Sequence, residues 1–145
     1  MKMYLLFAAV LLSSTAIGQD IPSREVPSAV INTIKAKFPN TTRLEWEKKG
    51  DLFEAEFHVN NIDHKALLEP SGKLLEYKRD IRAADLPRAV KNTSRKQYAN
   101  FRIDDVEKLA KEGAVFYQVE LDGEPHYQKL VISADGKVDS SQQYW

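Results

Sequence analysis

Two kinds of hydrophobic pattern alternate along the chain. An apolar side chain recurs at every fourth position from Val26 to Phe38, which is typical of one face of a helix, and Pro39 with Asn40 ends the pattern. Beyond it, residues 53–59 alternate between apolar and polar or charged side chains, which is typical of a half-buried strand. Four strands are expected after the helix, at residues 43–48, 53–59, 64–69 and 73–79.

The second half of the chain repeats this order of elements. When the sequence is shifted by 60 positions, residues 26–48 share eight identities with residues 86–108, far more than composition alone would give. After a four-residue insertion near residues 110–113 the shift becomes 64. The repeat predicts a second helix at residues 86–98, followed by strands at residues 102–109, 115–121, 126–133 and 137–144.

These elements predict an α+β fold built from tandem α-β-β-β-β repeats, the first at residues 19–82 and the second at residues 83–145. Every link between strands is a tight turn, so the sheet should be antiparallel, with the helices packed on one face. The other face should be open to water or to a partner. Period-two parity places on it the candidate binding residues, which are Glu54, Glu56, Lys65, Leu67, Gln118, Glu120, Lys129 and Val131.

Residues 1–18 have the features of a secretory signal peptide. Lys2 supplies the positive start, residues 4–12 form a short apolar run, and Ala16 and Gly18 suit the positions before a cleavage site. We therefore expect a mature chain that begins at Gln19 and is periplasmic or secreted. No later stretch approaches the roughly 20 apolar residues that a membrane-spanning helix needs, so no membrane span is expected after cleavage.

Several short motifs carry a resemblance to a known family. They are the helix start Val26-Pro27-Ser28-Ala29-Val30, then Phe38-Pro39-Asn40, Trp46-Glu47 and Ser71-Gly72-Lys73. Together they resemble the PepSY-like exported proteins of Bacteroidetes-type bacteria, tandem repeats related in fold to the beta-lactamase inhibitor protein. The second repeat departs from the pattern at Ser94, Ala99 and Val106. The resemblance implies a binding or inhibitory module and provides no catalytic residues.

The residue types present restrict the chemistry. The chain has 145 residues, no cysteine and a formal net charge of zero, so Cys-ligated zinc and thiolate catalysis are excluded and nucleic acid is not an expected partner. His58 and His64 flank a predicted hairpin, yet two histidines are too few for a zinc site. The paired carboxylates of Glu54 and Glu56 should solvate an open face. No enzyme activity, metal or cofactor is expected.

Two functions remain open at this stage. The first is a module that binds another envelope or extracellular protein through the open sheet face, with Leu67 and Val131 as exposed apolar anchors. The alternative is a small-ligand binder, for peptide, sugar or haem, that uses the cleft between the repeats near residues 80–85. A further candidate for sugar or peptide is the aromatic set Tyr77, Tyr127, Tyr144 and Trp145, although aromatic residues at strand spacing more usually pack within the fold.

Overall fold

The computed structural model describes residues 18–145, which form one antiparallel sheet of eight strands with two helices. The predicted signal peptide, apart from Gly18, lies outside the described residues. The strands follow the chain order and are β1 (Gln19–Asp20), β2 (Thr42–Lys49), β3 (Leu52–Val59), β4 (Ile62–Leu68), β5 (Leu74–Asp80), β6 (Arg102–Lys111), β7 (Ala114–Asp122) and β8 (Gln128–Ser133). The helices are α1 (Ser28–Lys37) and α2 (Arg88–Gln97). The predicted α+β class with an antiparallel sheet is confirmed.

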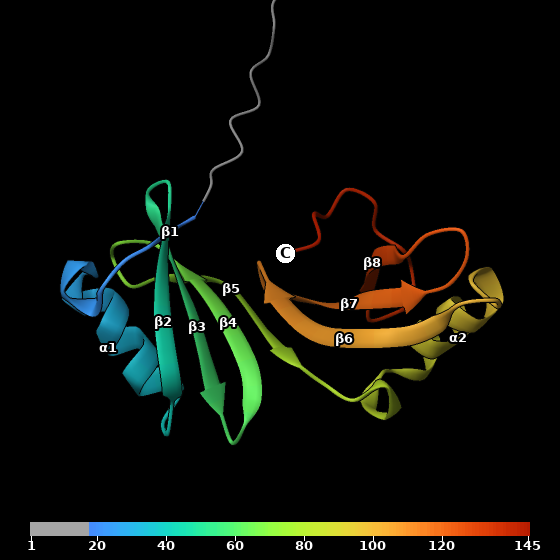
Figure 1. The fold of residues 1–145 in the computed structure, drawn as a ribbon, viewed down its shortest axis with the longest axis horizontal. Helices are drawn as coiled ribbons and strands as arrows, with labels where there is room; N and C mark the ends of the chain where they lie inside the picture. The colour runs from blue at the N-terminus through green and yellow to red at the C-terminus, as the bar shows by residue number, and fades with distance from the viewer. Residues whose placement is uncertain (1–17) are drawn as a thin grey trace, which may run out of the picture.

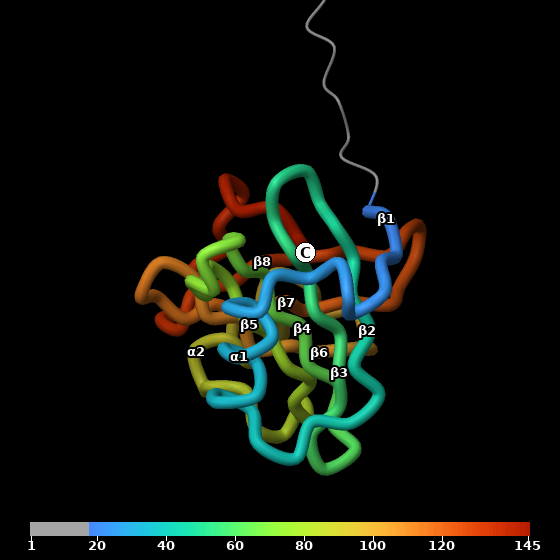
Figure 2. Tube along the Cα trace, turned by 90° about the vertical axis from the view of Figure 1, so that its left-hand side faces the viewer, coloured from blue at the N-terminus to red at the C-terminus, as the bar shows by residue number. Residues whose placement is uncertain are grey.

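The sheet bends so that its two halves lie at an angle to each other (Figure 1). Both helices lie on the outer side of the bend, one at each end, and Figure 2 shows them on the same side of the strands. The last residue of the chain lies on the inner side, between the halves. We call this inner side the concave face; it is the sheet face opposite the helices.

The repeat begins earlier in the chain than the sequence comparison recognised. Ile21 donates its backbone N–H to the carbonyl of Trp46 at 3.0 Å, and Ile81 donates in the same way to Val106 at 3.0 Å. Asp20 pairs with β2 as Asp80 pairs with β6. The end of β5 therefore pairs with β6 in the second repeat as β1 pairs with β2 in the first. The pairing of β5 with β6 joins both repeats into one sheet.

Each helix packs on its own strands through a separate apolar cluster. In the first repeat, Val30 and Ile34 of α1 are fully buried against side chains that include Phe57 and Leu68. In the second repeat, Val90 is fully buried, while Ser94 takes the place of the isoleucine and donates a hydrogen bond to the Val90 carbonyl at 3.3 Å. The two clusters are the separate hydrophobic interiors of the two repeats.

A turn after the third strand of each repeat touches the helix closely. Gly72 has a φ of +86°, and a Cβ there would lie 2.7 Å from the carbonyl oxygen of Ala29. The hydroxyl of Thr33 donates to the Gly72 carbonyl at 2.8 Å. The same contacts recur between α2 and Gly136 in the second repeat. Glycine is required here because the helix backbone occupies the space of a side chain.

The first long strand after the helix is irregular in each repeat. In β2 the pairing with β3 shifts between Thr42 and Glu45, where Arg43 has a φ of +51°. A matching shift interrupts β6 between Ile103 and Asp105. Bulges of this kind bend a strand and increase its twist, which contributes to the curvature of the sheet.

The predicted strand at residues 137–144 is wrong. Only Val138 forms an isolated bridge, to Ile132, and Asp139 donates its N–H to the Val131 carbonyl at 2.8 Å. The Asp139 carboxylate then accepts the backbone N–H of Ser141 at 3.0 Å, which turns the chain away from the sheet edge. The segment that follows crosses the concave face.

Candidate functional site

The eight predicted binding residues lie together on the concave face. Cross-strand pairs join Glu54 to Leu67 and Glu56 to Lys65 between β3 and β4. Matching pairs between β7 and β8 join the remaining four residues, which are Gln118, Glu120, Lys129 and Val131. Directly paired residues point to the same side of a sheet, so the period-two parity placed all eight correctly. Their role in binding stays a prediction.

The concave face is only partly open, so the expectation of a fully open face is wrong. The side chains of Glu54 and Gln118 are fully buried, and Val131 is only 4% exposed, although the sequence predicted it as an exposed anchor. Leu67 is half-buried rather than exposed. Tyr144 and Trp145 bond to or lie against charged and amide side chains of this face. Strand parity cannot reveal such cover, because it comes from a distant part of the chain.

Trp145 is held by three buried polar side chains, Glu54, Lys78 and Gln118, which we call the tryptophan seat. The indole N–H donates to Oε2 of Glu54 at 2.7 Å. The side-chain amide of Gln118 contacts the backbone of Trp145 twice. Its oxygen accepts a hydrogen bond from the Trp145 N–H at 2.6 Å, and its nitrogen donates one to the Trp145 carbonyl at 3.1 Å. The ammonium of Lys78 donates to the same carbonyl. The indole N–H, the backbone N–H and the carbonyl oxygen of Trp145 therefore each have a partner on the seat.

The two repeats contribute equivalent charged pairs beside this seat. Lys65 lies 2.5 Å from Glu56, and Lys129 lies 2.7 Å from Glu120, at positions separated by the 64-residue shift. The Lys65 ammonium lies 5.9 Å from the centre of a Trp145 ring, and that of Lys129 lies 4.9 Å from the centre of the Tyr144 ring. Each repeat thus places one lysine against an aromatic side chain, within cation–π distance.

The electrostatics of the seat favour the charged form of its carboxylate. Burial alone would raise the pKa of Glu54, but hydrogen bonds from Lys49 and Trp145, with the positive charge of Lys65, hold that pKa below its ordinary value. Burial alone would lower the pKa of Lys65, yet its contacts with Glu56 and Glu54 raise it. A buried carboxylate that remains ionised is a strong acceptor for an indole N–H.

A cluster of three carboxylates adjoins the seat. Glu47, Glu54 and Glu56 offer oxygen atoms that all lie within 4.8 Å of one another. The ammonium groups of Lys49 and Lys65 lie 2.8 Å and 3.4 Å from Oε1 of Glu54. These two cations offset two of the three negative charges, and each of the three carboxylates has an oxygen within 4 Å of an ammonium group.

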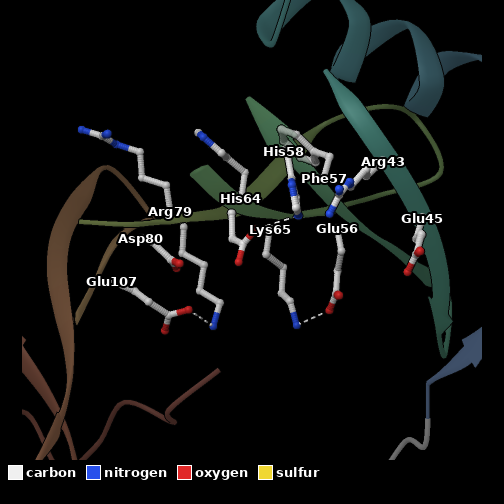
Figure 3. Close-up of a pocket in the computed structure, with 12 residues that line it drawn as sticks. Arg43, Glu45, Glu56, Phe57, His58, His64, Lys65, Arg79, Asp80 and Glu107 are labelled. Carbon is white, nitrogen blue, oxygen red and sulfur yellow. Dashed lines mark ion pairs between the residues drawn. The ribbon is translucent and has the colours of Figure 1, made fainter. Parts of the chain in front are cut away.

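A groove of about 380 Å³ continues along the concave face from the seat (Figure 3). Its walls carry both signs of charge, including the ion pairs Glu56–Lys65 and Glu107–Lys78, the second at 2.8 Å. Burial, together with the nearby carboxylates of Asp105 and Asp63, raises the pKa of Asp80 at one end of the groove to about 6. Charged side chains of both signs therefore make up most of the groove lining.

The cleft expected near residues 80–85 is present as a second cavity. It measures about 470 Å³ and is lined by residues that include Arg79, Asp80, Arg82 and Asp85. Arg82 and Asp85 form a two-bond ion pair, with distances of 2.8 Å and 2.9 Å. Arg82 and Asp85 are therefore already paired with each other, which leaves these two charges less available to a ligand.

The two histidines of the first repeat lie on opposite faces of the sheet. His58 pairs in register with Asp63 and lies 2.7 Å from its carboxylate, whereas His64 pairs with Phe57 on the helix side and lies 2.7 Å from the Tyr77 hydroxyl. The two rings therefore engage different partners and do not converge on a shared ligand position.

Sequence reasoning missed Lys78 and Glu107, which lie at the centre of the concave face on the two strands that join the repeats. It also assigned Tyr144 to a strand, and it left Trp145 outside the predicted elements. One signal was available: Lys65 and Lys129, like Glu56 and Glu120, occupy equivalent positions in the two repeats. Duplicated charges on one face indicate its centre, but the repeat comparison assigned residues 137–144 to a strand equivalent to residues 73–79 and so could not show that this segment crosses the face.

The sequence matches a family model twice, at residues 15–76 and 70–139. The family is PepSY-like, described as candidate beta-lactamase-inhibitor-like proteins, and the chain belongs to it. This confirms the resemblance drawn from the motifs. No curated protein matches the sequence. The family description is inhibitor-like and refers to no reaction.

Solved structures from Bacteroides share the fold at low sequence identity. A BLIP-like protein from Bacteroides fragilis has a TM-score of 0.67 and 22% identity, covering 82% of this chain and 92% of that one. A candidate periplasmic protein from Bacteroides eggerthii has a TM-score of 0.71 and 18% identity, covering 78% and 85%. A DUF2874 family protein from Bacteroides uniformis has a TM-score of 0.70 and 17% identity, covering 77% and 85%. Within residues 18–145, no helix is long and apolar enough to cross a membrane.

Proposed function

We propose that the protein is an exported, non-enzymatic binding module that recognises another envelope or extracellular protein through its concave face. The observation that carries the proposal is that this face already holds a peptide segment on charged side chains supplied by both repeats. Such a surface has hydrogen-bonding groups for a polypeptide backbone and lysines for aromatic side chains. The inhibitor-like family description supports the same reading.

The arrangement of charges suits selective recognition. Acidic and basic side chains alternate along the groove, so a partner must present the complementary order of charges to avoid unpaired ions. Such complementarity affects association rate and discrimination between partners more than affinity. We therefore expect the protein to bind selected partners rather than to bind proteins non-specifically.

Site-specific photocrosslinking tests the proposal in the native cells. A photoreactive residue replaces Glu56 on the concave face, whose side chain is 46% exposed, and a matched control replaces exposed Lys35 on α1. We expect one discrete protein adduct from position 56 and none from position 35. Equal adducts at both positions, or none at either, would refute recognition through the concave face.

Charge reversal gives a second, independent test. Glu56→Lys together with Glu120→Lys breaks both repeat-equivalent ion pairs and places like charges beside Lys65 and Lys129. We expect folding to survive, with a loss of about 2 kcal/mol or less, because partly exposed pairs contribute about 0–1 kcal/mol each. The adduct formed by the partner should disappear. An adduct that persists in the folded variant would place the contact elsewhere.

The cavity at residues 80–85 supports the alternative function, binding of a small ligand such as a peptide, sugar or haem. Native mass spectrometry of protein purified from its own cells distinguishes the two functions. A bound small molecule that is lost in Arg82→Ala would favour the alternative, whereas a mass equal to that of the chain alone favours the protein-binding module.

Export of the protein is tested by the position of its mature N-terminus. The mature N-terminus should be Gln19, because Ala16 and Gly18 fit the positions recognised by signal peptidase. Mass mapping of N-terminal peptides should find this start in the periplasmic or secreted fraction, with the glutamine in open or cyclised form. An intact Met1 in a membrane fraction would contradict it.

A further inference from the structure

The way in which Trp145 is held identifies the chemistry that the concave face selects. Its indole N–H, backbone N–H and carbonyl all bond to side chains that are nearly or fully buried, namely Glu54, Gln118 and Lys78. A phenylalanine or leucine would leave the Glu54 oxygen without this donor. This hydrogen bond favours tryptophan over those two residues at the seat, since a buried acceptor that loses its partner weakens binding.

The segment that carries Trp145 is joined to the sheet by few contacts. After the bridge at Val138 and the turn at Asp139, residues Ser140, Ser141 and Gln143 are exposed. Lys65 and Lys129 each pair with a glutamate of a neighbouring strand, Glu56 and Glu120. All three side chains of the seat also belong to strands of the sheet, so the segment meets groups that the sheet supplies, as a ligand would.

We propose that the tryptophan seat recognises a tryptophan-bearing segment of the partner protein, and that residues 139–145 occupy this seat in the free chain. The inference rests on the proposed function and adds the ligand class and its control. A tethered segment competes at an effective concentration near the millimolar range, so a partner must displace it. The free chain is consequently a self-occupied form, and the partner binds by exchange of one tryptophan for another.

Binding of a short peptide to the purified full-length chain tests this exchange. The probe is the labelled pentapeptide Ser-Gln-Gln-Tyr-Trp, amidated at its carboxyl end, and its affinity is measured by fluorescence anisotropy. We expect saturable binding to Trp145→Ala and at least about tenfold weaker binding to the wild-type chain. Tyr127→Ala, which removes a 59% exposed tyrosine outside the seat, is the matched control and should behave as wild type.

Changes in the peptide test the chemistry of the seat. Replacing its tryptophan with phenylalanine removes the indole donor to Glu54 together with part of the ring surface, and binding to Trp145→Ala should weaken about tenfold to a hundredfold. Replacement with alanine should abolish binding. Equal affinity of the tryptophan and phenylalanine peptides would overturn the assignment of the seat.

Other outcomes would overturn the proposal as a whole. They are absence of binding to folded Trp145→Ala, equal binding to both chains, and an unfolded Trp145→Ala by circular dichroism, which would make Trp145 a core residue. A wild-type dimer that Trp145→Ala dissociates would show that the segment is exchanged between copies instead. Failure here leaves the crosslinking at Glu56 unaffected, so the two proposals can fail separately.

Discussion

Equivalent positions in the two helices offer a controlled measurement of core packing. Ile34 and Ser94 are related by the 60-residue repeat, and both are buried, at 0% and 4% exposure. Ile34→Ala removes three carbon atoms from a fully enclosed site, for which we expect a loss of about 2–5 kcal/mol in the free energy of unfolding. Ser94→Ala removes only one hydroxyl. Its hydrogen bond to the Val90 carbonyl is long, at 3.3 Å, so the expected change is about 1 kcal/mol or less.

Urea unfolding monitored by circular dichroism measures both losses in the same chain. The two variants should unfold with the slope of the wild-type protein, so that the shift in midpoint reports stability alone. Large and equal losses at both positions would refute the reasoning, because the hydroxyl of Ser94 would then contribute as much to stability as three carbon atoms of Ile34. A small loss at Ile34 would show that its surroundings collapse to fill the space.

The remaining predictions concern charge and backbone geometry. Asp80 has its pKa raised from 3.8 to about 6, so the folded chain loses stability as the pH rises through this window. Asp80→Asn should remove that loss and stabilise the chain at pH 7.5 by up to about 1 kcal/mol, after allowance for solvent screening. Asp20→Asn, at the equivalent exposed position, is the control and should not stabilise the chain. Thermal melts across pH 4–8 measure it, and parallel curves for the wild type and Asp80→Asn would contradict it. Gly72→Ala should cost more than Gly50→Ala in urea melts, because both glycines have positive φ but only Gly72 faces a carbonyl, that of Ala29, within 3 Å. Equal losses would show that the helix yields to the added methyl group.

The sequence was sufficient for the elements that arise from local pattern. Four-residue spacing identified α1, and period-two alternation assigned residues such as Glu54 and Lys129 to the correct sheet face. These patterns depend only on helix and strand geometry. The internal repeat then indicated the class of fold, because two units with the same order of turns must build similar sheets.

The sequence was insufficient wherever contacts join distant parts of the chain. Glu54 and Trp145 are 91 positions apart, and no local pattern predicts that one covers the other. The end of β5 was assigned to the first repeat alone, because its pairing with β6 depends on the Asp80 and Ile81 backbone rather than on side-chain alternation. Curvature was missed for a related reason, since a bulge such as that at Arg43 is a property of the backbone.

The irregular ends of the sheet have a consequence for the behaviour of the protein in concentrated solution. An eight-stranded sheet has two borders whose free N–H and C=O groups would otherwise recruit strands from other molecules. At one border, β1 is only two residues long and the bulge at Arg43 distorts β2. At the other, residues 137–139 return against β8, where Ser133 donates to the Lys137 carbonyl at 2.9 Å. Both borders are thereby blunted against fibril-like stacking, so we expect the protein to resist edge-to-edge association even at high concentration.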